Sequence, residues 1–287
     1  MTNEQPSIPA WLHGFNDRQI QAVTHGEAPL LILAGAGSGK TRVITSRIAW
    51  LIAEKGFSAQ SILAVTFTNK AAAEMRERAA SLNPAAEKAV IRTFHSFGAW
   101  LLRRNAAAAG LSSNFTIYDD DDQASLLSQV LSGMPRRELK HWIQRISRAK
   151  DEGLSQEDDL SEISGNPAFP NVYRQYEERL RSIGNVDFGD LILLPLRLLQ
   201  HQREIRERIR QRFRAVLIDE YQDTNVAQYH LLKEITGPET WLGVVGDDDQ
   251  SIYRFRGAEV TNILKFAEVF PGTKVIKLEQ NLISGER

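Results

Sequence analysis

A glycine-rich segment between an apolar run and a helix-like pattern carries the clearest chemistry in this sequence. Its residues are Ala34, Gly35, Ala36, Gly37, Ser38, Gly39, Lys40 and Thr41, and they directly follow the apolar run 30–33. Glycines let successive backbone N–H groups approach an anion, and a helix N-terminus adds favourable partial charge. The spacing matches the phosphate-binding pattern G-x-x-x-x-G-K-[ST], except that alanine takes the first glycine position. We therefore expect a nucleoside triphosphate site; the alternative is a flexible turn without a ligand.

Four side chains, two from this region and two from a second segment, have the types that ATP hydrolysis requires. Lys40 would reach the β- and γ-phosphates, and the Thr41 hydroxyl would hold Mg²⁺. The apolar run 215–218 ends in Asp219 and Glu220. Asp219 would be the second partner of Mg²⁺, and Glu220 would orient and deprotonate the attacking water. An acidic strand end that merely faces solvent is the alternative.

Further polar and aromatic side chains follow other strand-like runs. Gln250 comes after the run 242–245, where a neutral amide could bond both a γ-phosphate and the attacking water. The segment 251–257 alternates aromatic and cationic residues, which suits stacking on bases and pairing with phosphates, although core packing of its aromatics is the alternative. Segments 66–70 and 93–97 likewise place aromatic and polar residues after strand-like runs.

Composition sets the broad class. The 287 residues are 42% hydrophobic and 25% charged, with a formal net charge of −1 and no cysteine. These values are ordinary for a globular protein and exclude disulfides and cysteine-based metal sites. The basic runs 136–150 and 197–214 could be nucleic-acid contacts or solvated helix faces. No signal-peptide pattern or membrane-length apolar run occurs, so we expect a cytoplasmic protein.

Strand-like runs alternate with helix-like patterns at both ends of the chain. The runs are 30–34, 62–67, 90–93, 215–218, 242–245 and 275–278, and the helical patterns that follow are 41–53, 70–80, 227–235 and 260–270. This alternation predicts an α/β fold with a parallel sheet. The stretch 96–212 reads as mostly helical without a strong strand. We therefore predict a nucleotide-binding domain formed by 1–95 and 213–287, interrupted by a helical subdomain at 96–212.

Taken together, these segments resemble the N-terminal half of a superfamily 1 DNA helicase of the UvrD/Rep/PcrA type. Seven segments carry the likeness: 15–19, 34–41, 65–72, 93–97, 187–191, 219–223 and 246–257. The resemblance implies a RecA-like P-loop NTPase fold, ATP and Mg²⁺ as ligands, and movement 3′ to 5′ along single-stranded DNA. It also implies a second RecA-like domain in the full-length protein and a role in DNA repair or replication.

The resemblance assigns roles that the residue types leave open. Gln19 would read the adenine edge, Arg42 would lie beside the nucleotide, and Gln250 would couple the γ-phosphate to the DNA track. The side chains that would line the path of single-stranded DNA are Phe67, Asn69, His95, Phe188, Tyr253, Phe255 and Arg256.

Two departures from the family pattern lie near the chain end. Leu282 replaces the tyrosine that stacks on adenine, and Ile283 replaces the arginine that reaches the γ-phosphate. The resemblance places an arginine finger in the second RecA-like domain, and because such a finger can contribute several orders of magnitude to turnover, we expect impaired hydrolysis by this chain alone. A nucleotide-gated single-stranded-DNA-binding module without motor activity is therefore the alternative function. The motor half of a helicase–nuclease subunit fits less well, because the helical insertion is short.

Overall fold

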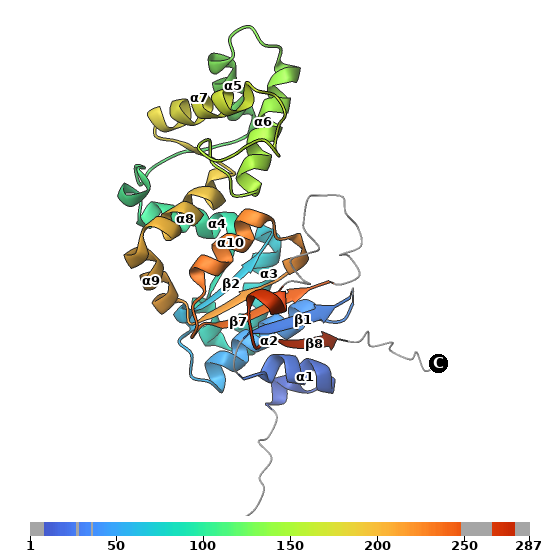
Figure 1. Cartoon of the computed structure of the whole chain (residues 1–287). Coiled ribbons are helices and arrows are strands. Elements are labelled where there is room, and N and C mark those ends of the chain that lie inside the picture. The colour runs from blue at the N-terminus through green and yellow to red at the C-terminus, as the bar shows by residue number, and fades with distance from the viewer. Residues whose placement is uncertain (1–8, 27–28, 36, 248–265, 279–287) are drawn as a thin grey trace, which may run out of the picture. The chain divides into compact units, whose positions relative to one another are not determined.

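The computed structural model describes residues 9–26, 29–35, 37–247 and 266–278 (Figure 1). These residues fall into two compact units. The sheet unit comprises Met1–Thr93, Arg210–Thr224 and Thr236–Arg287. The helical unit comprises Phe94–Ile209 and Asn225–Ile235.

A parallel six-stranded sheet forms the centre of the sheet unit. Its strands are β1 (Leu30–Ala34), β2 (Ile62–Thr66), β3 (Val90–Thr93), β6 (Ala215–Ile218), β7 (Trp241–Gly246) and β8 (Lys274–Leu278). They lie in the order β3-β2-β6-β7-β1-β8, and every pair is parallel. The near-continuous apolar runs follow from this arrangement, because strands buried on both faces need apolar residues at every position. All residues of β2 and β6 are buried.

The strand order brings three chain segments that are far apart in sequence to one edge. β7 pairs with β1 on one side and with β6 on the other, with Gly246 opposite Leu33 and Val244 opposite Ile218. Parallel strands end at the same edge, so the residues that follow these three strands emerge beside one another.

Three helices of the sheet unit are α1 (Asp17–Thr24), α2 (Lys40–Ala53) and α3 (Asn69–Leu82). α1 packs against α2, and α2 packs against α3. Two of these helices, α1 and α3, begin with a side-chain cap. The Asn16 side chain accepts a hydrogen bond from the Gln19 N–H, and the Thr68 hydroxyl accepts one from the Ala71 N–H. The buried guanidinium of Arg47 donates to the carbonyls of Val23 and His25 at 3.0 and 2.8 Å. It thereby caps the last carbonyls of α1 from α2.

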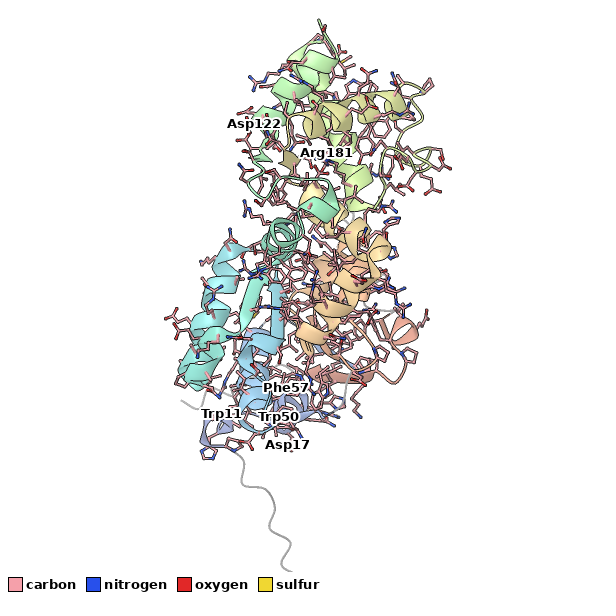
Figure 2. All side chains as sticks on the ribbon, turned by 90° about the vertical axis from the view of Figure 1, so that its left-hand side faces the viewer. Trp11, Asp17, Trp50, Phe57, Asp122 and Arg181 are labelled. Carbon is pink, nitrogen blue, oxygen red and sulfur yellow. The ribbon has the colours of Figure 1, made fainter. Side chains whose placement is uncertain are left out.

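Aromatic side chains close one end of the same core. Trp11, Trp50 and Phe57 gather at one end of the sheet unit (Figure 2). Trp241 contacts Trp50 and Phe57 with ring centroids 6.5 and 5.3 Å apart. The short 3₁₀ turns of this unit are η1 (Ala10–Leu12), η2 (Ala59–Ser61), η3 (Pro84–Lys88) and η5 (Tyr221–Asp223).

The helical unit is built from helices with one two-stranded pair. Its elements are α4 (Phe94–Arg104), η4 (Ala107–Ala109), β4 (Ile117–Tyr118), α5 (Asp120–Val130), α6 (Arg136–Asp151), α7 (Phe169–Ser182), β5 (Val186–Asp187), α8 (Asp190–His201), α9 (Arg203–Arg212) and α10 (Val226–Ile235). α4 and α8 approach so closely at Gly98 that an added Cβ would lie 1.7 Å from the Leu191 carbonyl oxygen. Stacked rings of Trp142, Phe169 and Tyr173 fill a second core.

The predicted α/β class is confirmed, and all six predicted strands are present. Three of the four predicted helices, at 41–53, 70–80 and 227–235, correspond to α2, α3 and α10, whereas most of 260–270 lies outside the described residues. The sequence pattern missed β4 and β5, whose two-residue pairing joins positions 69 residues apart (Ile117 with Val186). The predicted domain boundaries after residues 95 and 212 stay a prediction.

Among the described residues, no helix is both long and apolar enough to cross a membrane.

Candidate nucleotide and DNA site

The loop between β1 and α2 has a backbone that requires glycine. Gly37 and Gly39 adopt left-handed conformations with φ of 77° and 87°. A Cβ at Gly39 would also lie 3.1 Å from Gln19 Nε2, whereas nothing lies within 4 Å of a Cβ at Gly37. Ser38 closes the loop by donating from its hydroxyl to the Gly35 carbonyl at 2.7 Å. The loop therefore leads into the N-terminus of α2 with the shape of an anion cradle.

Lys40, the first residue of α2, lies between two carboxylates from neighbouring strand ends. Its Nζ is 3.2 Å from Glu220 Oε2, which follows β6, and 3.1 Å from Asp247 Oδ2, which follows β7. Burial alone would lower the pKa of Lys40, but the charges and hydrogen bonds of the two acids outweigh it and raise the pKa above its ordinary value. The ammonium is therefore charged and held at the sheet edge, where it can bind phosphates.

Asp219 is a buried carboxylate next to a second acid. Its backbone N–H donates to the Val65 carbonyl at 2.9 Å, which fixes it beside the end of β2. Burial, and then the charge of Glu220, raise its pKa to about 6. A divalent cation would favour the ionised form of this carboxylate, and carboxylate and hydroxyl oxygens are ligands that Mg²⁺ accepts. Asp219 and the half-buried Thr41 thus fit a magnesium ion by their chemistry.

Glu220 has a strained backbone and a partly exposed carboxylate. It is the one non-glycine residue with positive φ (52°) among the residues that the structure describes. Gln222 Nε2 donates to Glu220 Oε2 at 2.7 Å, and Gln222 Oε1 accepts from the Asp247 N–H at 3.0 Å. The Gln222 amide therefore ties the two acids that contact Lys40 to each other. Strain of this kind persists where surrounding contacts fix a functional side chain.

Gln19 ties α1 to the glycine-rich loop. Its Oε1 accepts from the Asn16 N–H at 3.0 Å, and its Nε2 donates to the Ser38 carbonyl at 2.9 Å. Arg42 lies nearby in the chain, with its guanidinium carbon 4.0 Å from the centre of the Phe15 ring. Both side chains thus have structural partners in addition to the nucleotide roles predicted for them.

In the helical unit, two of the predicted DNA-binding residues lie against each other. The rings of His95 and Phe188 are stacked, with centroids 3.9 Å apart and planes inclined by 21°. Phe188 is 54% exposed, which is unusual for so large an apolar side chain. Burial lowers the pKa of His95 to about 4, so the imidazole is neutral at pH 7. An exposed, supported aromatic face of this kind can stack on a base.

The chain is similar to a known protein family over most of its length. The profile of the UvrD/REP helicase N-terminal domain matches residues 15–271. The chain belongs to this family.

Several curated members of the UvrD/REP helicase family are similar to the chain over nearly all of it. ATP-dependent DNA helicase Rep of Escherichia coli is 44% identical, with 95% of this chain and 42% of Rep aligned. ATP-dependent DNA helicase PcrA of Bacillus subtilis is 44% identical over 96% of this chain and 38% of PcrA. UvrD1 of Mycobacterium tuberculosis is 47% identical over 94% of this chain and 37% of that protein. The chain thus spans about two fifths of the length of these relatives.

For this member of the UvrD/REP family, the structure brings together some of the predicted residues within each unit. The loop, Lys40 and Glu220 meet at the sheet edge, and His95 meets Phe188. Phe67 and Asn69 follow the end of β2 in the sheet unit, half-buried and exposed respectively. The predicted site residues that lie outside the described residues are Ala36, Gln250, Tyr253, Phe255 and Arg256, and Leu282 and Ile283 lie outside them too.

Two residues of the site were not singled out from the sequence. Asp247 is the first residue after β7, and its position at a strand end was a signal that could have identified it. Gln222 is two residues beyond Glu220, but no spacing rule predicts that its amide links Glu220 to Asp247.

Proposed function

We propose that this chain is the ATP- and single-stranded-DNA-binding N-terminal part of a DNA helicase. The observation that carries the proposal is the position of the Lys40 ammonium between Glu220 and Asp247 at the carboxyl edge of the sheet. An NTP hydrolase needs a cation for the phosphates, a carboxylate for the metal and a carboxylate for water, and this edge offers all three. The relatives are named ATP-dependent DNA helicases, and we take ATP, DNA and helicase activity in this proposal from those names.

In the proposed reaction, the backbone N–H groups of residues 34–41 and the Lys40 ammonium hold the phosphates. Thr41 and Asp219 would hold Mg²⁺, which when bound neutralises charge on the phosphates. Glu220, partly exposed and fixed by Gln222, orients the attacking water and takes its proton. Phosphates that bind Lys40 compete with its two ion pairs, so nucleotide binding loosens Glu220 from the ammonium.

The nucleotide and DNA roles of the remaining residues are part of the same proposal. Gln19 reads the adenine, Arg42 flanks the nucleotide, and Gln250 couples the γ-phosphate to DNA. The residues that form the DNA track are Phe67, Asn69, His95, Phe188, Tyr253, Phe255 and Arg256. Movement 3′ to 5′ and a role in DNA repair or replication are part of the proposal because the family resemblance implies them, and a cytoplasmic location is part of it because the sequence pattern favours one.

Nucleotide binding and turnover by the whole chain test the proposal. A fluorescent ATP analogue with Mg²⁺ should bind the wild type, and Lys40→Ala should weaken binding at least about tenfold, since a charged phosphate contact is lost. Lys88→Ala, an exposed lysine of the same unit, is the matched control and should bind as the wild type does. Absence of nucleotide binding by the wild type would overturn the proposal.

Steady-state hydrolysis with and without single-stranded DNA separates the two candidate functions. Turnover that DNA stimulates, and that Glu220→Gln abolishes, supports a helicase motor part. DNA binding that responds to nucleotide without any turnover supports the nucleotide-gated binding module instead. We expect slow turnover, because Ile283 stands where the family pattern has an arginine.

A further inference from the structure

A buried ionic cluster in the helical unit is not explained by nucleotide chemistry. The Lys150 ammonium of α6 contacts three carboxylates: Glu177 at 2.6 Å, Asp187 at 2.6 Å and Asp190 at 2.7 Å. Arg181, labelled in Figure 2, contacts Glu177 at 2.8 Å and Asp190 at 2.7 Å. Lys150 and the three acids are buried. We call these five residues the Lys150 cluster.

The three acids of the Lys150 cluster have the mutual spacing of a metal site, but a cation is already among them. Their carboxylate oxygens lie within 4.8 Å of one another. The Lys150 ammonium contacts each of the three and Arg181 contacts two of them, so protein cations already offset most of the negative charge of the acids. Removing one partner of a buried ionic group is strongly destabilising, which makes such a cluster a rigid element of structure.

Two acids of the cluster enclose the turn that carries Phe188. The Asp187 N–H donates to Asp190 Oδ2 at 3.0 Å, and the Asp190 N–H donates to Asp187 Oδ1 at 2.9 Å. Lys150 thus holds both ends of the turn through their side chains. The aliphatic part of the Lys150 side chain also packs directly against the turn. A Cβ added at Gly189 would lie 2.8 Å from Lys150 Cδ and 3.0 Å from Lys150 Cβ.

The exposed ring of Phe188 depends on this turn for its position. Phe188 is 54% exposed, so its apolar packing is incomplete, and the stacked His95 ring supports one face. Phe188, His95 and Gly189 line a cavity of about 1120 Å³ together with the basic side chains Lys140 and Arg148 of α6. The same cavity is also lined by the acids Asp119, Asp120, Asp121 and Asp151. The turn therefore presents an aromatic face to a space of mixed charge, in which Lys140 and Arg148 can contact phosphates.

We propose that Lys150 is a positioning residue that, through Asp187 and Asp190, fixes the Phe188 turn and thereby sets the affinity of this chain for single-stranded DNA. The DNA part of this inference rests on the proposed function. The positional part is independent of it, because it concerns the free protein.

Gly189→Ala tests the inference by moving the turn without changing any charge. Gly189 has helical dihedral angles (φ −65°, ψ −31°), so alanine is strained there only by its contact with Lys150. Gly165→Ala is the matched control in the same unit, since nothing lies within 4 Å of its Cβ. Lys150→Arg is a second variant, which keeps the charge but places a larger, planar guanidinium among the three carboxylates.

Two readouts are measured on each variant. The first is the pKa of His95 in the free protein, followed by NMR of the imidazole signals and assigned with His95→Gln. We expect it to rise from about 4 toward 6.5 in Gly189→Ala and Lys150→Arg, since a displaced Phe188 ring uncovers His95, and to stay unchanged in Gly165→Ala. The second is the affinity for a labelled oligothymidylate by fluorescence anisotropy, which we expect to fall about threefold to tenfold in the same two variants.

A double variant shows whether Gly189→Ala weakens DNA binding by displacing Phe188. Phe188→Leu should weaken DNA binding about tenfold, and adding Gly189→Ala to it should cost no further affinity. An unchanged His95 pKa in both turn variants, or a full additional loss in the double variant, would overturn the inference. If instead Phe188→Leu binds DNA as the wild type does while the His95 pKa still rises, Lys150 positions the turn but the DNA role proposed for Phe188 is wrong.

Discussion

The Lys40 ammonium lies 3.1 Å from the carboxylate of Asp247, whose side chain has no exposed surface. The two residues are 207 positions apart in the chain and meet because β1 and β7 are parallel neighbours. The lysine of the glycine-rich loop is thus already engaged by protein acids at the place where we propose that phosphates contact it. Its affinity for phosphate therefore depends on how strongly those acids hold it.

Asp247→Asn should strengthen the binding of ADP in the absence of Mg²⁺. The change removes one of two carboxylates that compete with phosphates for Lys40. The loss of this opposing charge beside the partly exposed Lys40 is worth about 1 kcal/mol, or about fivefold in affinity. Isothermal titration calorimetry measures it, with Glu239→Gln as control, because that exposed acid precedes β7 at the opposite end of the strand. Unchanged or weaker binding in Asp247→Asn would contradict the competition.

Glu220→Gly should be more stable than Glu220→Ala by about 1 kcal/mol in free energy of unfolding. Residue 220 has φ of 52°, a conformation that glycine adopts without the steric cost that a Cβ brings. Both variants lack the carboxylate, so both should lose turnover by roughly a hundredfold or more. Urea unfolding followed by far-UV circular dichroism compares them. Equal stabilities would mean that the backbone of residue 220 carries no strain.

Gly98→Ala should destabilise the helical unit by at least about 2 kcal/mol. The added methyl would lie 1.7 Å from the Leu191 carbonyl oxygen, so α4 and α8 must separate. Thermal and urea unfolding measure the effect. Gly165→Ala serves as the control, and we expect it to stay within about 0.5 kcal/mol of the wild type. A Gly98→Ala protein as stable as this control would show that the two helices are not in close contact.

Stability should depend on His95 between pH 7 and pH 4. Burial lowers the pKa of His95 from 6.5 to about 4, so folding favours the neutral imidazole. The resulting stabilisation is complete above pH 6.5 and is lost as pH falls toward 4, because the unfolded state then binds the extra proton. It amounts to at most about 3 kcal/mol.

The measurement is the difference in free energy of unfolding between the wild type and His95→Gln at several pH values. This difference should change in favour of the variant as the solution is acidified. His141→Gln, which alters an exposed histidine of the same unit, should follow the wild type at every pH. If His95→Gln also follows the wild type, the imidazole is not shielded from water.

Much of the sheet could be predicted from the sequence, because most of its strands are nearly continuous apolar runs bounded by glycine or polar residues. The runs that became β1 and β6 are examples, and the segments after them carry the glycine-rich loop and the acids. The β4–β5 pair could not be predicted, since two-residue strands have no periodicity and their pairing depends on register across 69 residues (Ile117 with Val186). The basic run 136–150 was ambiguous for a similar reason: charge alone did not indicate that Lys150 is buried while Lys140 is exposed.

The sequence by itself determined the local chemistry of this protein: the glycine-rich loop before a helix, the acids after a strand, and the family to which such segments belong. These features are encoded in residue types at short spacing, where backbone geometry relates them directly. Only the tertiary structure decided that Asp247 and Gln222 complete the surroundings of Lys40 and Glu220, and that Lys150 lies beneath the Phe188 turn. Contacts of this kind depend on strand order and on the packing of distant helices, and no local pattern specifies either.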